Sequence, residues 1–279
     1  MCLVLLGWRA HPEYRLIVAA NRDEFYVRPT ESMRWWPETP GLLAGRDLGA
    51  RGRIGTWLGL ATGTNRFAAV TNVRNPCDER PEARSRGALL LDYLGDQDRG
   101  GPGKYLQSVA AGPDDYNGYH VVASDLGSLW WHSNRSAQPP RELPPGFHGL
   151  SNGRFLTSAA PGPAAELRSP ERIWPKVRDG VDGLRKVVES DPGAVHRYFE
   201  VLADRTEAPD DQLPDTGIEL PFERAVSARF VAHLVHGTRA STVLLVREDG
   251  TFEMVERSFG RLGRRAGEAG FQGTVTLPD

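Results

Sequence analysis

The sequence contains few cysteines and no long hydrophobic run. Its 279 residues include two cysteines, Cys2 and Cys77, which excludes a disulfide framework and leaves neither with a partner at zinc-binding spacing. The longest apolar run, residues 3–8, is far shorter than the about 20 residues that span a bilayer. This run also lacks the basic segment and cleavage site of a secretory signal. We therefore expect a cytoplasmic protein with no membrane span, in which any cysteine chemistry comes from the thiol.

An excess of one charge is also lacking, because 34 basic residues are balanced by 36 acidic ones and the formal net charge is -2. A chain without a basic excess has no general attraction for nucleic acid or acidic lipid, so we expect no nucleic-acid partner. Lysine is scarce as well, and Lys104, Lys176 and Lys186 leave few groups for Schiff-base chemistry. Hydrophobic residues make up 39% of the chain, which supports a folded core in one large domain or two small ones.

Short β-favouring runs are present along most of the chain, and they are paired across turn residues. A run of this kind, followed by a turn and a second run, predicts an antiparallel hairpin. The last turn contains Asp249-Gly250, which is among the strongest local hairpin signals. The predicted pairs are residues 3–8 with 16–20, 56–61 with 67–73, 119–124 with 129–133, and 242–247 with 251–257.

Helical patterns lie between these hairpins, at residues 88–94, 104–110, 173–189 and 192–202. The third carries apolar residues three or four positions apart, from Ile173 to Val188, which predicts one apolar stripe. Strands at both ends of the chain with helices between them predict a layered α+β domain whose first and last strands share a sheet. The Pro- and Gly-rich residues 135–146 and 159–170 are typical of surface loops.

The second residue is the first that suggests chemistry. Cys2 is small enough to permit removal of Met1, which would leave a cysteine with a free α-amino group. An α-amine titrates at about 7.7 to 8.0 and a thiol at about 8.5, so a neutral amine can take the thiol proton at neutral pH. The alternative is that Cys2 is only a small apolar residue at the start of an edge strand.

Four polar residues follow the second predicted strand directly. Asn21, Arg22, Asp23 and Glu24 supply an amide, a guanidinium and two carboxylates, which are costly to bury unless they pair or meet a ligand. A solvated turn is the alternative. With an N-terminal Met-Cys and several later motifs, in matching order over nearly the whole chain, this run resembles the NRDE family, also called the transport and Golgi organisation protein 2 family. The later motifs are Gly45-Arg46-Asp47-Leu48, Gly55-Thr56-Trp57-Leu58-Gly59, Phe67-Ala68-Ala69-Val70-Thr71-Asn72, Gly149-Leu150-Ser151-Asn152, Gly237-Thr238-Arg239 and Ser241-Thr242-Val243-Leu244-Leu245-Val246.

The resemblance carries a fold and a set of roles, because that family is similar to the N-terminal nucleophile (Ntn) hydrolases. It implies a single domain over residues 1–279, which forms a four-layer αββα sandwich of two antiparallel sheets flanked by helices, with the nucleophile at the start of the first strand. It also implies that Arg22 and Asp23 hold the amine and thiol of Cys2, or Glu24 in place of the acid if the register slips by one. Neutral amide donors suit an oxyanion. The catalytic candidates are Cys2, Arg22, Asp23, Asn72, Asn152 and Arg239, the substrate-binding candidates are Asn21, Glu24 and Trp57, and no metal site is expected.

The sequence departs from the family after Ser151-Asn152, where residues 153–172 intervene before Ile173-Trp174-Pro175-Lys176. This insertion leaves the substrate specificity and the role of Asn152 open. Residues 149–153 also match the G-x-S-x-G serine motif, but that motif needs a helix directly after it, and residues 154–163 do not predict one. His233 and His236 could share a helix face, yet they lack a third metal ligand. We interpret Cys77 as a bystander.

Two classes of function remain. The first is a hydrolase that forms an acyl-enzyme on Cys2 from a small-molecule amide or thioester and needs no cofactor. The second is a binding or trafficking protein for haem, lipid or acyl-coenzyme A on the same fold, since relatives that resemble this chain are linked to those ligands. No C-x-x-C-H haem signature is present. The sequence predicts neither the acyl group nor the oligomeric state.

Overall fold

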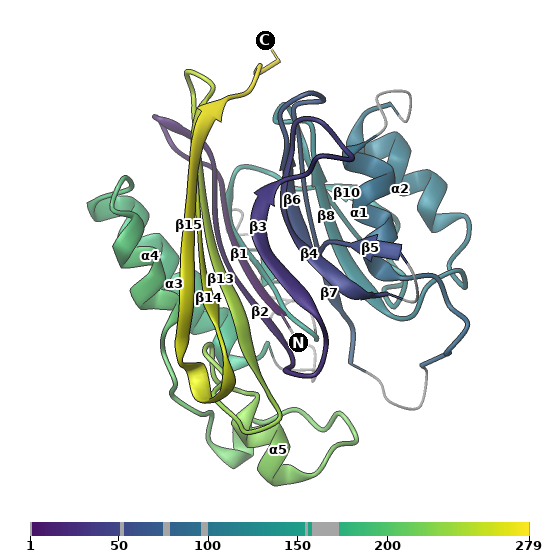
Figure 1. The fold of residues 1–279 in the computed structure, drawn as a ribbon, viewed down its shortest axis with the longest axis vertical. Helices are drawn as coiled ribbons and strands as arrows, with labels where there is room; N and C mark the ends of the chain where they lie inside the picture. Colours follow the sequence, from purple (N-terminus) through teal and green to yellow (C-terminus); the bar gives the residue numbers. More distant parts are fainter. Residues whose placement is uncertain are drawn as a thin grey trace.

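The chain folds into two antiparallel sheets that lie face to face, with helices on their outer faces (Figure 1). The computed structural model describes residues 2–50, 53–74, 79–95, 100–153, 156–157 and 173–278. Within these residues the first sheet has seven strands. Their order is β12 (Leu156–Thr157), β11 (Gly146–Leu150), β1 (Cys2–His11), β2 (Tyr14–Phe25), β13 (His236–Arg247), β14 (Thr251–Phe259) and β15 (Arg265–Thr274).

The second sheet has eight strands within the described residues, and one of them lies off the main path. Its order is β10 (Arg141–Glu142), β9 (Leu129–Ser133), β8 (Tyr119–Ser124), β7 (Arg66–Asn72), β6 (Leu58–Ala61), β4 (Leu42–Ala50) and β3 (Thr30–Trp35), with β5 (Arg53–Gly55) paired to β4.

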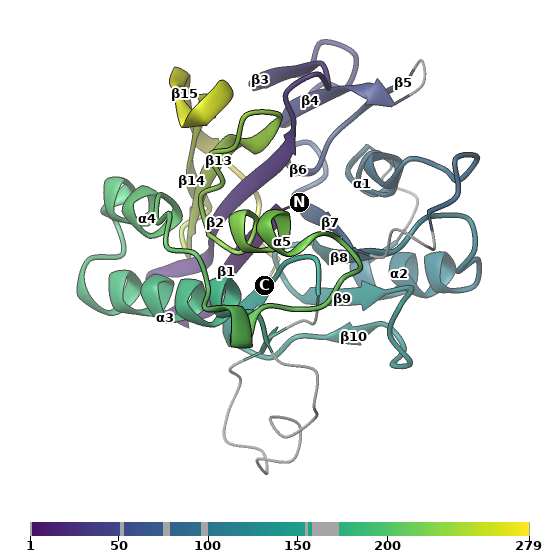
Figure 2. The ribbon, with the colours of Figure 1, turned by 90° about the horizontal axis from the view of Figure 1, so that it is seen from below.

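Helices pack on the outer face of each sheet, and Figure 2 shows the two helix pairs on opposite sides of the molecule. One pair, α1 (Arg86–Leu94) and α2 (Pro102–Ala110), covers the second sheet, and the other, α3 (Pro175–Ser190) and α4 (Val195–Leu202), covers the first. A shorter helix, α5 (Leu220–Ala225), lies at the end of the sheets where β1 begins. Single turns of 3₁₀ helix occupy Asp210–Gln212 and Arg261–Gly263. No helix in the described part of the chain is long and apolar enough to cross a membrane.

The alternation of side chains along each strand divides the apolar residues into three clusters. In β1, Val4 and Leu6 pack between the two sheets, whereas Leu3 and Leu5 pack beneath α3. Successive side chains of a strand point to opposite faces, so a strand that is covered on both sides is apolar throughout. This double burial explains the unbroken hydrophobic run that begins the sequence.

The predicted hairpins and helices are present, and strands from both ends of the chain share the first sheet. At the amino-terminal end, the alternative that places Cys2 in an edge strand is wrong, and so is the expectation that residues 21–24 follow the second strand. Strand β1 is central, between β11 and β2, and is therefore not an edge strand. Strand β2 continues to Phe25, so residues 21–24 lie inside the strand, because β1 and β13 pair with its far end.

Other parts of the prediction were incomplete. The expected loop at residues 135–146 contains β10. The expected loop at residues 159–170 lies outside the described residues, as does Cys77.

Candidate functional site

Cys2 lies at the start of a central strand, with its side chain between the two sheets. It is 9% exposed and belongs to the apolar cluster that joins the sheets. Its carbonyl oxygen accepts a hydrogen bond from the Ser151 hydroxyl at 2.8 Å, which fixes the end of β1 against the chain after β11. Burial raises the pKa of the Cys2 thiol, while the positive charges of the amino terminus and Arg22 lower it. The thiol therefore depends on nearby cations to ionise.

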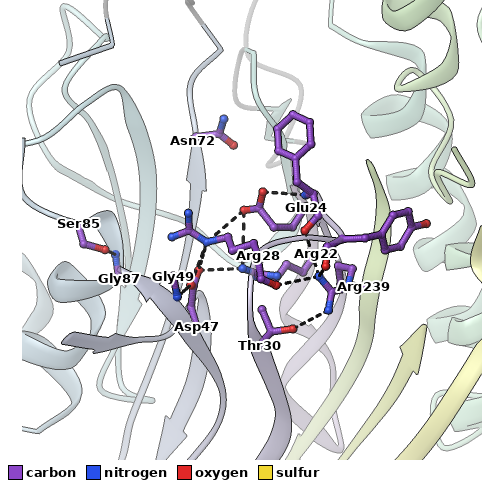
Figure 3. A network of polar contacts seen from close by, with 12 residues as sticks. Arg22, Glu24, Arg28, Thr30, Asp47, Gly49, Asn72, Ser85, Gly87 and Arg239 are labelled. Carbon is purple, nitrogen blue, oxygen red and sulfur yellow. Dashed lines mark hydrogen bonds and ion pairs between the residues drawn. The ribbon is translucent and has the colours of Figure 1, made fainter. Parts of the chain in front are cut away.

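Arg22 is the direct cross-strand partner of Cys2, so the two side chains share a face of the sheet. One Arg22 nitrogen, Nη2, donates to the Asp47 carboxylate at 2.8 Å, and Arg28 donates to the same carboxylate at 2.9 Å (Figure 3). Burial acts to raise the pKa of Asp47, but these two arginines hold it below its usual value. The other terminal nitrogen of Arg22, Nη1, is buried and has no hydrogen-bond partner within the described residues. A free N–H donor therefore lies on the face that carries the thiol.

Asp23 faces the opposite side of the same sheet. Its carboxylate accepts a hydrogen bond from the Thr238 hydroxyl at 2.7 Å, and the Thr238 oxygen accepts the backbone N–H of Val231 at 2.9 Å. Since Cys2 pairs with Arg22, Asp23 lies one position further along β2, on the side of the Cys2 backbone nitrogen. Burial raises the pKa of Asp23, and the charges of the amino terminus and Lys176 oppose this rise. Arg22 and Asp23 are both buried, so the solvated-turn alternative is wrong.

The other residues expected near Cys2 are distributed over both faces of the sheet. Asn21 faces the helices, where its amide donates to the carbonyls of Leu202 and Arg229. The Oε2 atom of Glu24 lies 3.6 Å from Nε of Arg28 and 3.7 Å from Nη2 of Arg22, so Glu24 is on the side of the Asp47 network. Trp57 packs in the same intersheet cluster as Cys2.

Arg239 organises the connection between β2 and β3. Its guanidinium donates to the carbonyls of Phe25 and Arg28, both at 3.1 Å, and to the Thr30 hydroxyl at 3.0 Å (Figure 3). The register of β13 against β2 shifts between Thr238 and Ala240, which brackets Arg239. Arg239 thus fixes the turn that borders the Arg22–Asp47 network.

The two asparagines expected to bind an oxyanion contact one another. The amide nitrogen of Asn152 donates to the Asn72 side-chain oxygen at 2.6 Å and to its backbone carbonyl at 2.9 Å. Asn152 is buried, whereas Asn72 is partly exposed. The Asn72 side-chain nitrogen makes no hydrogen bond to another described residue. Asn152 therefore orients Asn72, which is left with the free N–H donors.

Several charged groups around the site were not singled out from the sequence. Asp47 and Arg28 complete the network on the thiol face, and the buried Lys176 lies near Asp23 on the helix face. Arg86, the first residue of α1, has its pKa lowered by burial, while Glu79 and Cys2 act to raise it. Only the Gly-Arg-Asp motif around Asp47 and the Trp-Pro-Lys motif at Lys176 gave any signal, and neither motif indicated a role.

The competing motifs find no support in this geometry. Ser151 is fully buried and donates to the Cys2 carbonyl, and the next helix within the described residues begins at Pro175. His236 is in β13, and His233 is in the loop before it, so they do not share a helix face. The described residues contain no group of three or more His, Cys, Asp or Glu that could hold a metal ion.

Comparison with known proteins gives consistent matches over nearly the whole chain. The model of the family described as Transport and Golgi organisation 2 matches residues 1–261. The chain is 34% identical over 280 residues to the Transport and Golgi organization protein 2 homolog of Bos taurus, with 92% of this chain and 93% of the relative covered. It is 32% identical over 271 residues to the Transport and Golgi organization 2 homolog of Mus musculus, with the same coverage. The Drosophila melanogaster protein Transport and Golgi organization protein 2 is 25% identical over 279 residues, with 92% of each chain covered.

Proposed function

Because the chain belongs to the Transport and Golgi organisation 2 family, we propose that the site around Cys2 is that of an N-terminal-cysteine hydrolase, which acts on an amide or thioester acyl bond. The observation that carries this proposal is the placement of Cys2. Its thiol lies beside Arg22 between the sheets, and Asp23 lies on the side of its backbone nitrogen. Two facing antiparallel sheets with outer helices are consistent with the four-layer Ntn-hydrolase sandwich.

The proposed reaction begins once Met1 has been removed and Cys2 has a free α-amine. The neutral amine takes the thiol proton, and Arg22 stabilises the thiolate. The sulfur bonds to the acyl carbon, and the carbonyl oxygen becomes an oxyanion that accepts hydrogen bonds from the Asn72 amide. An uncharged donor stabilises such an oxyanion without binding an anionic product tightly.

The acyl-enzyme then forms and is hydrolysed, and the α-amine of Cys2 carries the proton in both steps. When the oxyanion re-forms the carbonyl, the carbon–nitrogen or carbon–sulfur bond breaks, and the ammonium gives its proton to the leaving group. The amine next removes a proton from water, and the hydroxide attacks the thioester carbon. Breakdown releases a carboxylic acid, and the ammonium returns its proton to the Cys2 sulfur. Asp23 holds the amine in place throughout.

Intact-mass spectrometry and labelling test this function. Purified protein is expected to lack Met1, to form a covalent acyl adduct with an activated acyl ester, and to react with iodoacetamide first at Cys2. Cys2→Ala should abolish the adduct and turnover, and Cys77→Ala should retain both. Retention of Met1 on every molecule, or full turnover by Cys2→Ala, would overturn the proposal.

A further inference from the structure

Ser151 is a fully buried residue whose hydroxyl and carbonyl groups both make hydrogen bonds at the site. Its hydroxyl donates to the Cys2 carbonyl at 2.8 Å, and the same oxygen lies 3.3 Å from the side-chain oxygen of Asn152. Its carbonyl accepts a hydrogen bond from the Thr71 hydroxyl at 2.6 Å. Cys2 begins β1 of the first sheet, and Thr71 belongs to β7 of the second. Ser151 therefore joins the two sheets beside the proposed nucleophile.

Each of these two hydroxyl residues is followed by one of the two asparagines. Asn152 follows Ser151, and Asn72 follows Thr71. The Asn152 amide donates to the side-chain and backbone oxygens of Asn72 at 2.6 and 2.9 Å. The backbone N–H of Arg74 donates in turn to the Asn152 carbonyl at 3.0 Å. The end of β7, which contains the proposed oxyanion donor, is therefore hydrogen-bonded along its length to the segment that holds Cys2.

The two reacting parts of the proposed site belong to different sheets. The sulfur belongs to β1, and the proposed oxyanion donor, the Asn72 amide, belongs to β7. Apolar side chains hold the sheets together, but hydrophobic contacts are non-directional, whereas hydrogen bonds are directional. For attack, the sulfur must lie about 3 to 3.5 Å from the acyl carbon while the donor reaches the oxygen, and a misplacement of about 1 Å can cost about 10²-fold in rate.

We propose that Ser151 and Thr71 are positioning residues, which fix the Cys2 sulfur relative to the Asn72 amide through hydrogen bonds across the two sheets. This inference rests on the proposed function. Both hydroxyls donate to backbone carbonyls, and the two residues are 0% and 1% exposed, so neither hydroxyl is a group that contacts substrate. The arrangement also gives a reason why a hydroxyl residue directly precedes each asparagine of the pair.

The test compares variants of Thr71 that separate the hydrogen bond from the packing. Thr71→Val keeps the shape of the side chain and removes the donor to Ser151, whereas Thr71→Ser keeps the donor and removes a methyl group. With para-nitrophenyl acetate as the acyl probe, Thr71→Val should lower kcat by about 10-fold to 10²-fold and leave KM unchanged, because the loss falls on the transition state. Ser151→Ala should lower kcat in the same way, and Thr71→Ser should keep most of the wild-type kcat.

Two further measurements distinguish positioning from a general loss of structure. Alkylation of Cys2 by iodoacetamide uses the sulfur but no oxyanion donor, so Thr71→Val should be alkylated at the wild-type rate. In the Asn72→Leu background, Thr71→Val should cause little further loss of kcat, because the donor that Thr71 positions is already absent.

Ser124→Ala is the matched control, because Ser124 is another fully buried hydroxyl residue of the second sheet. Its hydroxyl donates to the Ser128 carbonyl at 2.6 Å, and Ser124 pairs with Phe67 at the far end of β7 from Thr71. This variant loses a hydrogen bond of the same kind and should leave kcat unchanged.

The outcomes separate this inference from the function on which it rests. An equal fall in kcat in Thr71→Val and Thr71→Ser, or the same fall in Ser124→Ala, would give Thr71 and Ser151 a structural role only and overturn the inference. Full additivity of Thr71→Val with Asn72→Leu would also overturn it. If the wild type forms no acyl adduct with the probe, or Cys2→Ala hydrolyses the probe at the wild-type rate, the proposed function fails and the inference fails with it, whatever the Thr71 variants do.

Discussion

The ion pair between Arg74 and Glu223 gives the most direct prediction about stability. Their side chains are 8% and 4% exposed, and the Arg74 nitrogen lies 2.6 Å from the Glu223 carboxylate. The second carboxylate oxygen of Glu223 accepts the Thr216 hydroxyl at 2.5 Å. Glu223→Gln keeps the shape and one acceptor oxygen but leaves the guanidinium without this counter-charge.

The expected size follows from burial. Removal of one partner of a buried ion pair destabilises a protein by about 3 to 5 kcal/mol, because the remaining charge stays desolvated. The glutamine oxygen can still accept from Arg74, so we expect Glu223→Gln to lower the free energy of unfolding by about 3 kcal/mol. Replacing both partners with apolar residues, as in Arg74→Met with Glu223→Leu, should recover most of this loss.

The assay is urea unfolding at pH 7 of Glu223→Gln, of Arg74→Met and Glu223→Leu as single variants, and of the double variant. The last three, compared with the wild type, give the interaction free energy of the pair. Asp210→Asn is the matched control, because it removes the exposed ion-pair partner of Arg224, which is in the same helix as Glu223. It should cause no measurable change in the free energy of unfolding. A loss below about 1 kcal/mol in Glu223→Gln, or simple additivity in the double variant, would refute the reasoning.

Three further predictions concern other described residues. Burial raises the pKa of Glu256 from 4.5 to about 7. The protonated carboxyl therefore stabilises the folded state fully below pH 4.5, and this contribution is lost as the pH rises through 7. Urea unfolding between pH 5 and 8 should show a decline in the free energy of unfolding, and Glu256→Gln should remove this decline. Asn72→Leu should lower kcat of the proposed hydrolase by about 10² to 10³, and an unchanged kcat would exclude Asn72 as the oxyanion donor. Asn21→Ala removes the hydrogen bonds to Leu202, Arg229 and Ser241 and should lower the free energy of unfolding by about 3 kcal/mol, while Cys2 alkylation stays at the wild-type rate.

The sequence predicts the fold well where local patterns reflect burial. Both faces of β1 and β2 are covered, so their apolar runs are continuous, and the helical stripe from Val177 to Val188 matches the face that α3 buries. Strand β15 could not be predicted in this way. It is largely exposed, has no apolar alternation and owes its conformation to pairing with β14.

The site is less predictable because its parts come from distant positions. Cys2 and Arg22 are neighbours in a hairpin, and a hairpin register can be inferred from sequence. Asp47 reaches Arg22 from the opposite sheet, and Ser151 reaches the Cys2 carbonyl from 149 residues further along the chain. No local spacing records such contacts. The same limit applies to the hydrogen bonds from the Asn152 amide to Asn72, which no local pattern predicts.

The opposite orientations of Arg22 and Asp23 make the first sheet a partition. In the proposed reaction, a substrate that enters between the sheets meets the sulfur and the guanidinium, whereas the carboxylate that holds the α-amine lies on the other face of the sheet. Under that proposal, substitutions on the intersheet face change which compounds are accepted without altering the carboxylate on the helix face. Shifting β2 by a single residue would exchange the two and disable both.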